Sequence, residues 1–559
     1  MDFILALHSH LPWVLNHGRW PHGSDWLCEA AVDTYLPLLE ELDALAHDEV
    51  AAPVTIGITP VLANQLASPT FVIELEDFIT HRLVSIDEAE TDLAALGQTA
   101  LIPLVGYWRN RMRHLRDRFR RENGDLITAF RRLESEGRLE IMGSAATHGF
   151  LPLLSREESI RLQLAVGRSE HERLFGRAPR GCWLPECAYR PGGVWAPLPD
   201  APGQGYRRGV EAFLSEAGFR YFFTDAHMAR AGRAYVGSSE LLTGAQRQPG
   251  GPASTEEVSR SPYRAYRLAT DRPSQSLATL VRDPRSSAQV WSRGEGYPGD
   301  EWYLEFHKIR WPGGLKLWRV SGPGSDLGAK QPYDPAHALT RAVEHGQHFA
   351  RVLRDTAAKE GPARDAVVAA PFDTELFGHW WHEGPDFVGA TYRALREDTT
   401  VRPVTASRHL ATHPPRATLE LAAGSWGADG DWSMWLNDET AWTWRMLWPL
   451  ETAFWDAAPK ALADPARRPV LAQAARALLL AQSSDWQFII STGAVADYAI
   501  RRFNGHCEEL ASLLEALGSA DPARLEEGRR LAANLGVRDS LFPDVLSSVE
   551  HVLRGGRAS

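Results

Sequence analysis

Two carboxylates in this sequence each follow a short apolar segment, at the point where a buried strand would end. Glu186 follows residues 182–184 and a proline, and Asp373 follows residues 367–370. Burying an unpaired charge is costly, so a carboxylate in such a place is expected to have a use. Two carboxylates about 5–5.5 Å apart can act as nucleophile and acid/base when a glycosidic bond is cleaved with retention. The alternative is that both carboxylates are structural and cap helices in the loops after strands.

Other polar residues also follow apolar segments. His8 and His10 follow residues 3–7, His148 comes after residues 139–142, and Asp225 follows residues 221–224. In βα barrels the reactive side chains gather at the carboxyl ends of the strands. These positions therefore predict a single site at one end of a barrel.

The same histidines, with His379 and His382, could be read as metal ligands. A catalytic zinc site needs three protein ligands and a supporting second layer of residues. His8 and His10 fit better as donors to sugar hydroxyls. We therefore expect no metal and no other cofactor.

Short apolar segments that fit buried parallel strands recur along the first two thirds of the chain. They comprise residues 3–7, 54–58, 139–142, 182–184, 221–224, 277–281, 315–320 and 367–370. Longer segments with helical spacing separate most of them, which is typical of βα units. Seven or eight such strands favour an α/β barrel over an open sheet.

Two insertions are expected within the barrel, and a different domain after it. Residues 74–137 are highly charged with helical spacing, which predicts a small helical subdomain. Residues 228–262 are rich in Gly, Ser, Arg and Pro without periodicity, and we interpret them as a flexible lid loop that carries Tyr235. From residue 413 onward we expect helices only, so the domains are predicted at 1–412 and 413–559.

The composition is that of an ordinary globular protein, with 44% hydrophobic and 23% charged residues. A net charge of −11 argues against nucleic acid or an anionic membrane as a partner. The N-terminus does not resemble a signal peptide, and no segment approaches the roughly 18 apolar residues of a membrane span. Four scattered cysteines do not make a disulfide framework, so we predict a cytoplasmic protein.

The twenty tryptophans are the unusual feature of the composition. A tryptophan ring can fill a core, or it can stack on the C–H face of a sugar ring. Trp26 belongs to the loop after the first predicted strand, and Trp291, Trp426 and Trp435 lie beside Gly-rich segments. Such loops offer little core to fill, so we expect these four rings to bind substrate.

Five segments, in order along the chain, resemble the conserved regions of glycoside hydrolase family 57. They are His-Ser-His-Leu-Pro (8–12), Glu-Ile-Met-Gly (140–143) with His148, Trp-Leu-Pro-Glu-Cys-Ala-Tyr (183–189), Pro-Phe-Asp-Thr-Glu-Leu-Phe-Gly-His-Trp-Trp (371–381) and Ser-Asp-Trp-Gln-Phe (484–488). The resemblance spans most of the chain. It implies an incomplete (β/α)7 barrel with an inserted helical subdomain and a C-terminal helical domain.

The resemblance also implies a retaining mechanism without metal. Carried over by motif, Glu186 is the nucleophile and Asp373 the general acid/base. His10 and His148 would lie beside the reacting sugar, and Asp485 with Trp486 would close the site from the helical domain.

Within the family the sequence is most similar to the 1,4-α-glucan branching enzymes, which implies a substrate such as amylose or glycogen. An α-amylase or 4-α-glucanotransferase of the same family is the first alternative. A metal-dependent polysaccharide deacetylase and a glucan-binding protein without activity are the others, and the presence of both Glu186 and Asp373 argues against the last.

Overall fold

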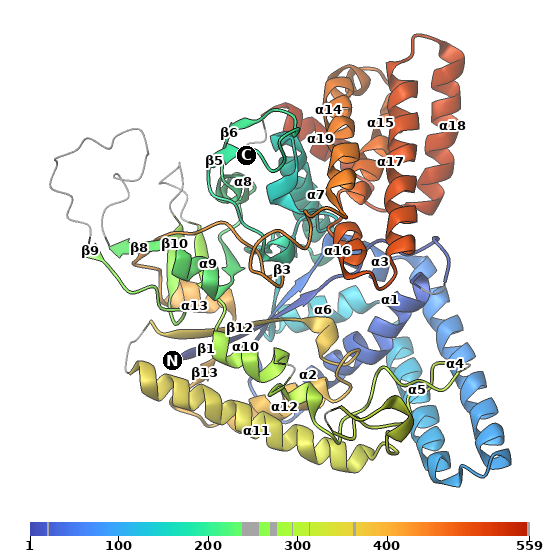
Figure 1. Cartoon of the computed structure of the whole chain (residues 1–559), viewed down its shortest axis with the longest axis vertical. Coiled ribbons are helices and arrows are strands. Elements are labelled where there is room, and N and C mark those ends of the chain that lie inside the picture. The colour runs from blue at the N-terminus through green and yellow to red at the C-terminus, as the bar shows by residue number, and fades with distance from the viewer. Residues whose placement is uncertain are drawn as a thin grey trace.

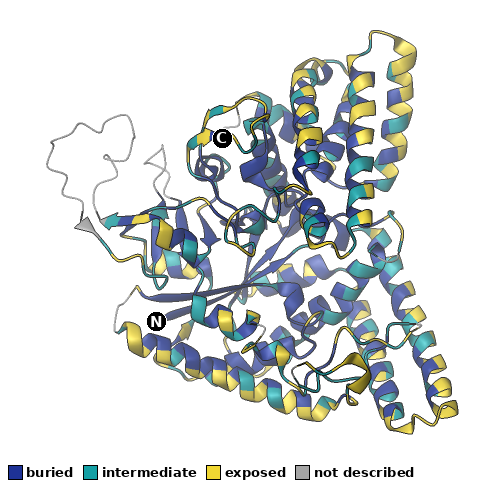
Figure 2. Cartoon of the chain, in the orientation of Figure 1, coloured by how far each residue is buried: buried dark blue, intermediate teal, exposed yellow. Residues whose placement is uncertain are grey.

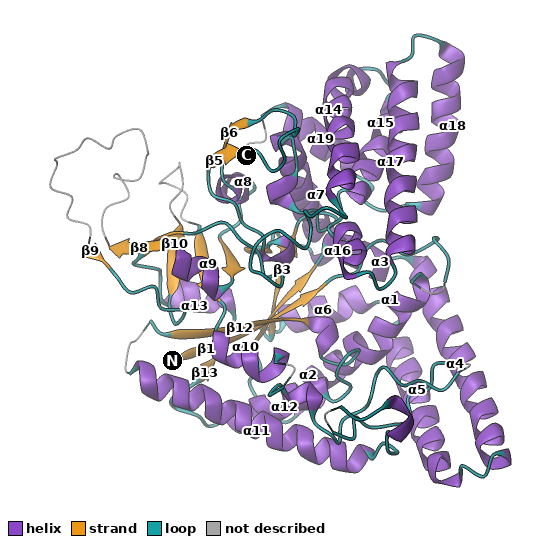
Figure 3. Cartoon of the chain, in the orientation of Figure 1, coloured by secondary structure: helices purple, strands orange, loops and turns teal. Residues whose placement is uncertain are grey.

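The computed structural model describes residues 1–19, 22–236, 256–268, 277–292, 294–311, 313–322, 324–361 and 365–555. Most of the predicted lid, residues 237–255, lies outside the described residues. Strands occupy the centre of the molecule and helices surround them (Figure 3). Among the described residues, no helix is long and apolar enough to cross a membrane.

Seven parallel strands form the central barrel, and they confirm the predicted incomplete (β/α)7 fold. Their order around the barrel is β12-β1-β2-β3-β4-β7-β11, and each neighbouring pair is parallel. Their bounds are β1 Asp2–Ser9, β2 Val54–Ile58, β3 Leu139–Ser144, β4 Gly181–Trp183, β7 Tyr221–Thr224, β11 Ala278–Val281 and β12 Val367–Asp373.

The barrel is incomplete because the ladder between β11 and β12 is almost missing. One parallel bridge, Arg282 to Ala369, joins them. The free edge of β11 pairs instead with an antiparallel strand, β10 (Ala265–Leu268). From β10 the sheet continues away from the barrel through β14 (Thr418–Glu420), β8 (Arg233–Val236) and β9 (Glu256–Glu257).

Two strand predictions were wrong. Residues 315–320 are not a barrel strand: Leu315 and Trp318 make isolated bridges to Arg310 and Pro332 in a loop outside the barrel. Lys316 interrupts this apolar segment and pairs with Asp33 at 3.1 Å, so the segment is amphipathic rather than buried on both sides. The second error is β14, a strand within the segment where only helices were expected.

Helices cover the outside of the barrel, and the expected helical insertion is present as a hairpin of α4 and α5 followed by α6 (Figure 1). The buried residues Trp108, Met112, Leu115 and Phe119 form one face of α5, as their spacing predicts. The helices before residue 413 are α1 Ser24–Ala30, α2 Leu36–His47, α3 Pro60–Leu66, α4 Pro69–Ala95, α5 Ile102–Arg121, α6 Leu126–Ser135, α7 Glu157–Phe175, α8 Val210–Glu216, α9 Ala226–Ala231, α10 Pro284–Trp291, α11 Pro335–Glu360, α12 Gly384–Leu395 and α13 Ala406–Thr412.

The C-terminal part is helical from residue 441. The long helices α14, α15, α17 and α18 stand side by side, and the short α16 lies at the end nearest the barrel (Figure 1). A loop at residues 421–440 connects β14 to this bundle. The bounds are α14 Ala441–Ala463, α15 Arg468–Ala481, α16 Asp485–Thr492, α17 Ala496–Gly518, α18 Pro522–Arg538 and α19 Val545–Leu553.

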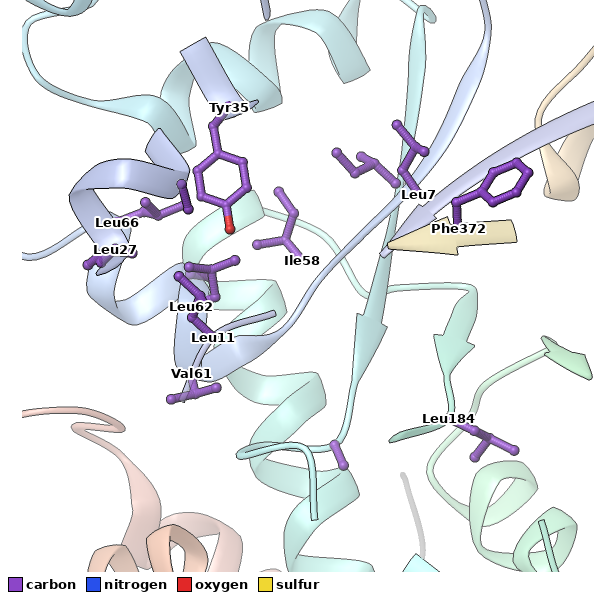
Figure 4. Packing of buried hydrophobic residues seen from close by; sticks show 14 of the residues in the cluster. Leu7, Leu11, Leu27, Tyr35, Ile58, Val61, Leu62, Leu66, Leu184 and Phe372 are labelled. Carbon is purple, nitrogen blue, oxygen red and sulfur yellow. The ribbon is translucent and has the colours of Figure 1, made fainter. Parts of the chain in front are cut away.

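The barrel separates two apolar clusters, because successive side chains of a strand point to opposite faces. In β1, Phe3, Leu5 and Leu7 pack outward against the helices, whereas Ile4 and Ala6 point into the barrel. The outer cluster is continuous with the helical layers, and buried residues line the inner faces of the helices (Figures 2 and 4). The alternation predicts which residue at each strand end faces the interior.

Candidate active site

The inward positions of the strands change from apolar to charged at the carboxyl end of the barrel. In β1 the inward series Ile4 and Ala6 continues to His8, and in β12 the series Val367 and Ala369 continues to Asp373. His8 and Asp373 are register partners on adjacent strands. A charged layer therefore lies directly above the apolar interior.

Two further strands contribute an ion pair to the same layer. The inward residues of β7 lead to Asp225, and those of β11 lead to Arg282. Arg282 Nη1 donates to Asp225 Oδ2 at 3.0 Å, and its guanidinium lies 5.8 Å from the centre of the Trp426 ring. His227 also contacts Asp225, at 3.2 Å. A paired arginine thus borders the two predicted catalytic carboxylates.

Glu186 is held by donors from outside the barrel. Its Oε2 accepts a hydrogen bond from Trp426 Nε1 at 3.0 Å, and its Oε1 accepts one from Ser484 Oγ at 3.0 Å. The backbone N–H of Trp426 donates to the Glu186 carbonyl at 3.0 Å. Trp426 comes from the 421–440 loop and Ser484 from the start of the helical bundle, so parts distant in sequence orient this carboxylate.

The backbone at Glu186 is also unusual. Glu186 has a φ of 60° and Cys187 a φ of 49°, in the left-handed region that residues other than glycine rarely adopt. His148 has the same φ of 60°. Such conformations cost on the order of 1–3 kcal/mol each and cluster at functional sites. The surrounding structure holds this strained turn after Pro185, and the turn directs the Glu186 carboxylate inward.

Three histidines are stacked beside these carboxylates. The ring centres of His10 and His148 are 4.0 Å apart, and His8 lies 4.9 Å from His148 and 4.6 Å from the Trp183 ring. The Nε2 atoms of His8 and His148 share a hydrogen bond of 3.0 Å, and His148 Nδ1 is 3.0 Å from Ser484 Oγ. Burial lowers the pKa of both His8 and His148 well below the ordinary value, which keeps them neutral.

His10 differs from its two neighbours because it has an acidic partner. Its Nε2 lies 2.9 Å from Asp485 Oδ2, and its Nδ1 lies 3.0 Å from Thr59 Oγ1. Burial acts to lower the pKa of His10, but the Asp485 carboxylate outweighs burial and the net pKa is raised. In the same pair, the pKa of Asp485 is lowered although burial opposes this. The barrel and the helical bundle therefore meet through a charged hydrogen bond.

Asp373 lies in a different environment from Glu186. No hydrogen bond reaches its carboxyl from any residue that the structure describes. Burial raises the pKa of Asp373 well above its usual value, the nearby Glu375 and Glu186 carboxylates raise it further, and Arg282 opposes them. Burial also raises the pKa of Glu186, but the hydrogen bonds from Trp426 and Ser484 work against this rise. The surroundings of the two carboxyls therefore act differently on their pKa values.

Glu375 is a third carboxyl of this centre, and its importance was not foreseen. It is buried, and Tyr35 donates a hydrogen bond to its Oε1 at 2.5 Å. Burial raises the pKa of Glu375 to about 7. Ser484, Trp183 and Arg282 were also missed as parts of the site. Strand alternation could have identified Arg282, since it continues the inward series Ala278 and Leu280.

The structure brings six of the predicted site residues into one connected centre. Shared hydrogen bonds, ring stacking and charge interactions connect Glu186, Asp373, His10, His148, Trp426 and Asp485. Trp426 contacts Glu186 through its indole N–H and its backbone N–H. The predicted stacking of its ring on a sugar would be a separate contact.

Two of the predicted substrate-binding tryptophans are core residues instead. Trp435 is 1% exposed and stacks on Phe150 with ring centres 4.7 Å apart. Trp486 is fully buried, and its Nε1 donates to the Leu480 carbonyl at 2.8 Å. Both rings already have apolar partners, so neither presents a face to a substrate. The expectation that a tryptophan beside a Gly-rich segment has little core to fill was wrong for Trp435, whereas Trp486 was expected at the site from the family resemblance.

The remaining predicted binding residues lie around the centre rather than in it. Trp291 is 40% exposed and borders a cavity that also contains Asp225 and Arg282. Trp26, in α1, is partly buried and packs against the main core. The Tyr235 hydroxyl is 3.5 Å from Glu420 Oε1 in the sheet extension. Their roles in binding stay predictions.

Two clusters in the described part of the chain have spacings that could hold a metal ion. One contains Asp2, His409 and His413, and the other contains His506, Glu509 and Asp539. Neither includes a residue of the catalytic centre. In both, an arginine already pairs with a carboxylate: Arg402 with Asp2, and Arg538 with Asp539.

Comparisons with known proteins agree with this geometry. A sequence profile described as "Glycosyl hydrolase family 57" matches residues 4–422, and one described as "1,4-alpha-glucan branching enzyme, C-terminal" matches residues 450–549. A protein of Thermococcus kodakarensis named a 1,4-alpha-glucan branching enzyme is 38% identical over 536 residues, which cover 93% of this chain and 75% of that protein.

Solved structures give the same result. The structure of a GH57-type branching enzyme from Pyrococcus horikoshii is similar with a TM-score of 0.87 and 36% identity, and covers 98% of this chain and 96% of its own. An α-amylase from Thermotoga maritima has a TM-score of 0.80 and 28% identity, with 98% of each chain covered.

Proposed function

Since the chain belongs to glycosyl hydrolase family 57, we propose that it is a 1,4-α-glucan branching enzyme, which cleaves an α-1,4 link and forms an α-1,6 branch. Relatives similar over most of the chain carry this name, and a profile for the C-terminal region of such enzymes matches the helical bundle. The solved α-amylase is less similar, at 28% identity against 36% for the branching enzyme.

The observation that carries the catalytic assignment is the contrast between the two carboxyls. Two donors hold Glu186, whereas Asp373 is partly buried beside other carboxylates with its pKa well above the usual value. A pair of carboxyls whose environments separate their pKa values supplies one nucleophile and one proton donor. Glu186 is therefore the nucleophile and Asp373 the general acid.

The reaction then has two steps. The Glu186 carboxylate attacks the anomeric carbon, while Asp373 gives its proton to the glycosidic oxygen and the C–O bond to the leaving chain breaks. The product is a glycosyl ester on Glu186 and an ionised Asp373. In the second step Asp373 takes the proton of a glucan 6-hydroxyl, whose oxygen attacks the anomeric carbon and releases Glu186.

The histidine stack has a positioning role in this scheme. Neutral His8 and His148 are held by their shared hydrogen bond and by the contact of His148 with Ser484, and His10 is anchored to Asp485 at 2.9 Å. The stack thus places its rings beside the reacting sugar without adding a net charge next to the oxocarbenium-like transition state. The pairing of His10 with Asp485 also keeps the helical bundle against the barrel end.

Transfer in place of hydrolysis requires that water be kept from the glycosyl ester. The 421–440 loop and the start of α16 cover one side of Glu186 through Trp426 and Ser484. Residues 228–262 remain our candidate lid; Tyr235 lies in β8, and residues 237–255 lie outside the described residues. Deletion of this lid should raise the share of hydrolysis if it has this role.

Product analysis tests the function. The protein is incubated with amylose, and α-1,6 linkages are counted by NMR against newly released reducing ends. A branching enzyme gives new α-1,6 linkages, with Asp373→Asn as the inactive control. Linear oligosaccharides without branches would instead identify an amylase or 4-α-glucanotransferase, and activity that a chelator removes would identify a deacetylase.

Mass spectrometry tests the retaining mechanism. A fluorinated glycosyl fluoride that forms a slow-reacting ester should label the peptide that contains Glu186. Labelling of another peptide would contradict the assignment of the nucleophile.

The domain division is also a proposal. We assign residues 1–412, with the insertions 74–137 and 228–262, to the catalytic unit and residues 413–559 to the helical unit, except that β14 belongs with the barrel sheet. A cytoplasmic location is consistent with four free, buried cysteines. The proposed partner is the α-glucan itself, and neither nucleic acid nor a membrane is part of the proposal.

A further inference from the structure

A cavity of about 1260 Å³ lies next to the catalytic segment that follows β12. Its walls come from residues 289–292 and 294–307, residues 320–322 and 324–330 and one face of α11, and Leu376 and Trp380 also line it. Leu376 is three residues from Asp373, in the short turn after the strand. The cavity therefore lies beside the segment that carries the proposed general acid.

The cavity borders a smaller one at the charged layer of the barrel. Trp291 and Ser292 line both this cavity and the smaller one, of about 380 Å³, which Asp225 and Arg282 also line. Arg282 interacts electrostatically with Asp373. Trp291 is thus shared by the large cavity and the pocket of the ion pair that acts on the proposed general acid.

Three large aromatic residues of the cavity are exposed. Trp291, Trp380 and Phe306 have 40%, 38% and 38% of their surfaces accessible, although most other tryptophans of the chain are buried. Large exposed rings in a concave surface mark a binding site. Their flat apolar faces suit the C–H faces of sugar rings.

The polar groups of the cavity are balanced in charge. Arg341 pairs with Asp300 at 2.8 Å, and Lys330 pairs with Glu305 at 2.7 Å. His348, two helical turns from Arg341 on the same face of α11, is 2.7 Å from the Tyr297 hydroxyl through its Nδ1. Paired charges attract an anionic ligand weakly, but they supply many donors and acceptors for hydroxyl groups. This chemistry fits a neutral polyhydroxylated ligand.

The size of the cavity favours a polymer over a small molecule. Pockets for small molecules hold roughly 300–1,000 Å³, and this cavity is larger and open at its outer end. We propose that it binds the acceptor α-glucan chain and presents a 6-hydroxyl to Asp373. The assignment of the ligand as an acceptor rests on the proposed branching activity, whereas glucan binding in the cavity does not.

Acceptor kinetics test the proposal. The variants Trp380→Ala and His348→Ala remove one ring and one polar group from the lining of the cavity. With amylose as donor and a labelled maltooligosaccharide as added acceptor, each variant should raise the apparent KM for the acceptor about tenfold. The ratio of branches to new reducing ends should fall in parallel. The matched controls Trp311→Ala and Val343→Ala change exposed residues outside the cavity and should leave both quantities unchanged.

A binding experiment separates this proposal from the proposed function. Calorimetry on the inactive Asp373→Asn enzyme with maltoheptaose should show two binding sites, and Trp380→Ala or His348→Ala in that background should remove one. If wild-type enzyme forms no α-1,6 linkages, the branching function fails, but loss of a site in these variants still supports glucan binding in the cavity. A single site in the parent, or an unchanged number of sites and acceptor KM in both variants, would overturn the inference.

Discussion

Two aspartates of this protein, one partly buried and one buried, have opposite environments. Asp373 lies in the catalytic centre without a hydrogen-bond donor among the described residues, and its pKa is raised by burial and by neighbouring carboxylates. Asp539, at the end of α18, is 1% exposed and is bound by His17 at 2.6 Å and by Arg538 at 2.5 Å. Burial acts to raise the pKa of Asp539, but these partners lower it well below the usual range.

The difference shows that the partners of a buried carboxyl, more than its burial, decide whether it keeps a proton. Asp539 joins the loop after β1 to the last helices, 522 residues apart in the chain. Removing one partner of such a buried pair leaves an uncompensated charge. Asp373 has no such partner to lose, so its carboxyl serves reactivity rather than stability.

The largest expected effect is on activity at Asp373. The variant Asp373→Asn removes the proton donor and should reduce kcat on the order of 10³-fold. Because no hydrogen bond is lost and a partly buried acid is replaced by a neutral isostere, Tm should stay the same or rise. A clear fall in Tm, measured by scanning calorimetry, would show that Asp373 stabilises the fold, as Asp539 does.

The largest expected effect on stability is at Asp539. The variant Asp539→Asn leaves Arg538 and His17 without their buried anion and should destabilise the protein by roughly 3 kcal/mol. Thermal unfolding is the measurement, and kcat at low temperature should change little. Asp456→Asn is the control, since the Asp456 side chain is 70% exposed. Equal Tm values for the two variants would rule out a stabilising role for the pair.

The next effect is a shift of the pH profile of activity. Turnover requires a protonated Asp373, so activity is lost as pH rises through the pKa of this group. Glu375→Gln removes a neighbouring negative charge and should move the alkaline limb to lower pH by about one unit. Arg282→Gln removes a positive charge and should move the limb to higher pH. Glu136→Gln, on the surface, is the control, and shifts of the same sign in both variants would contradict the assignment.

The smallest effect is on the pH dependence of stability. The pKa of Glu375 is about 7 in the folded protein, above its ordinary value of 4.5. Between these values the folded state keeps a proton that the unfolded state releases, so this group makes the protein less stable as pH rises. Glu375→Gln removes the effect, and its Tm relative to wild type should therefore increase between pH 5 and pH 7.5. A constant difference would show that Glu375 is ionised throughout.

The sequence contained much of the fold and the chemistry of the site. Apolar segments ending in polar residues predicted all seven barrel strands: the bounds of β2 and β7 match, and the largest error is at β12, which extends three residues beyond the prediction. Glu186 and Asp373 were identified because a charge after a buried strand is conspicuous. Arg282 could have been found by extending the alternation of β11, since residues 278 and 280 point inward.

Other features depend on contacts between distant segments, which no local sequence pattern predicts. Trp426 and Trp435 lie nine residues apart in one polar loop, yet one binds Glu186 and the other is 1% exposed against Phe150. Their surroundings are built by distant segments, so composition could not separate them. The amphipathic segment at residues 315–320 has the length of a strand, but its partners lie in its own loop.

The nearly missing ladder between β11 and β12 has a consequence for how this enzyme could change. The segment from Pro284 to Glu360 connects β11 to β12 and contains no barrel strand. It includes α10, α11 and most of the residues that line the large cavity. Since a single backbone bridge joins β11 and β12, replacing this segment would leave the six strand–strand interfaces of the barrel untouched. Recombination of this one segment could exchange most of the cavity lining in a single event, while both proposed catalytic carboxylates keep their positions.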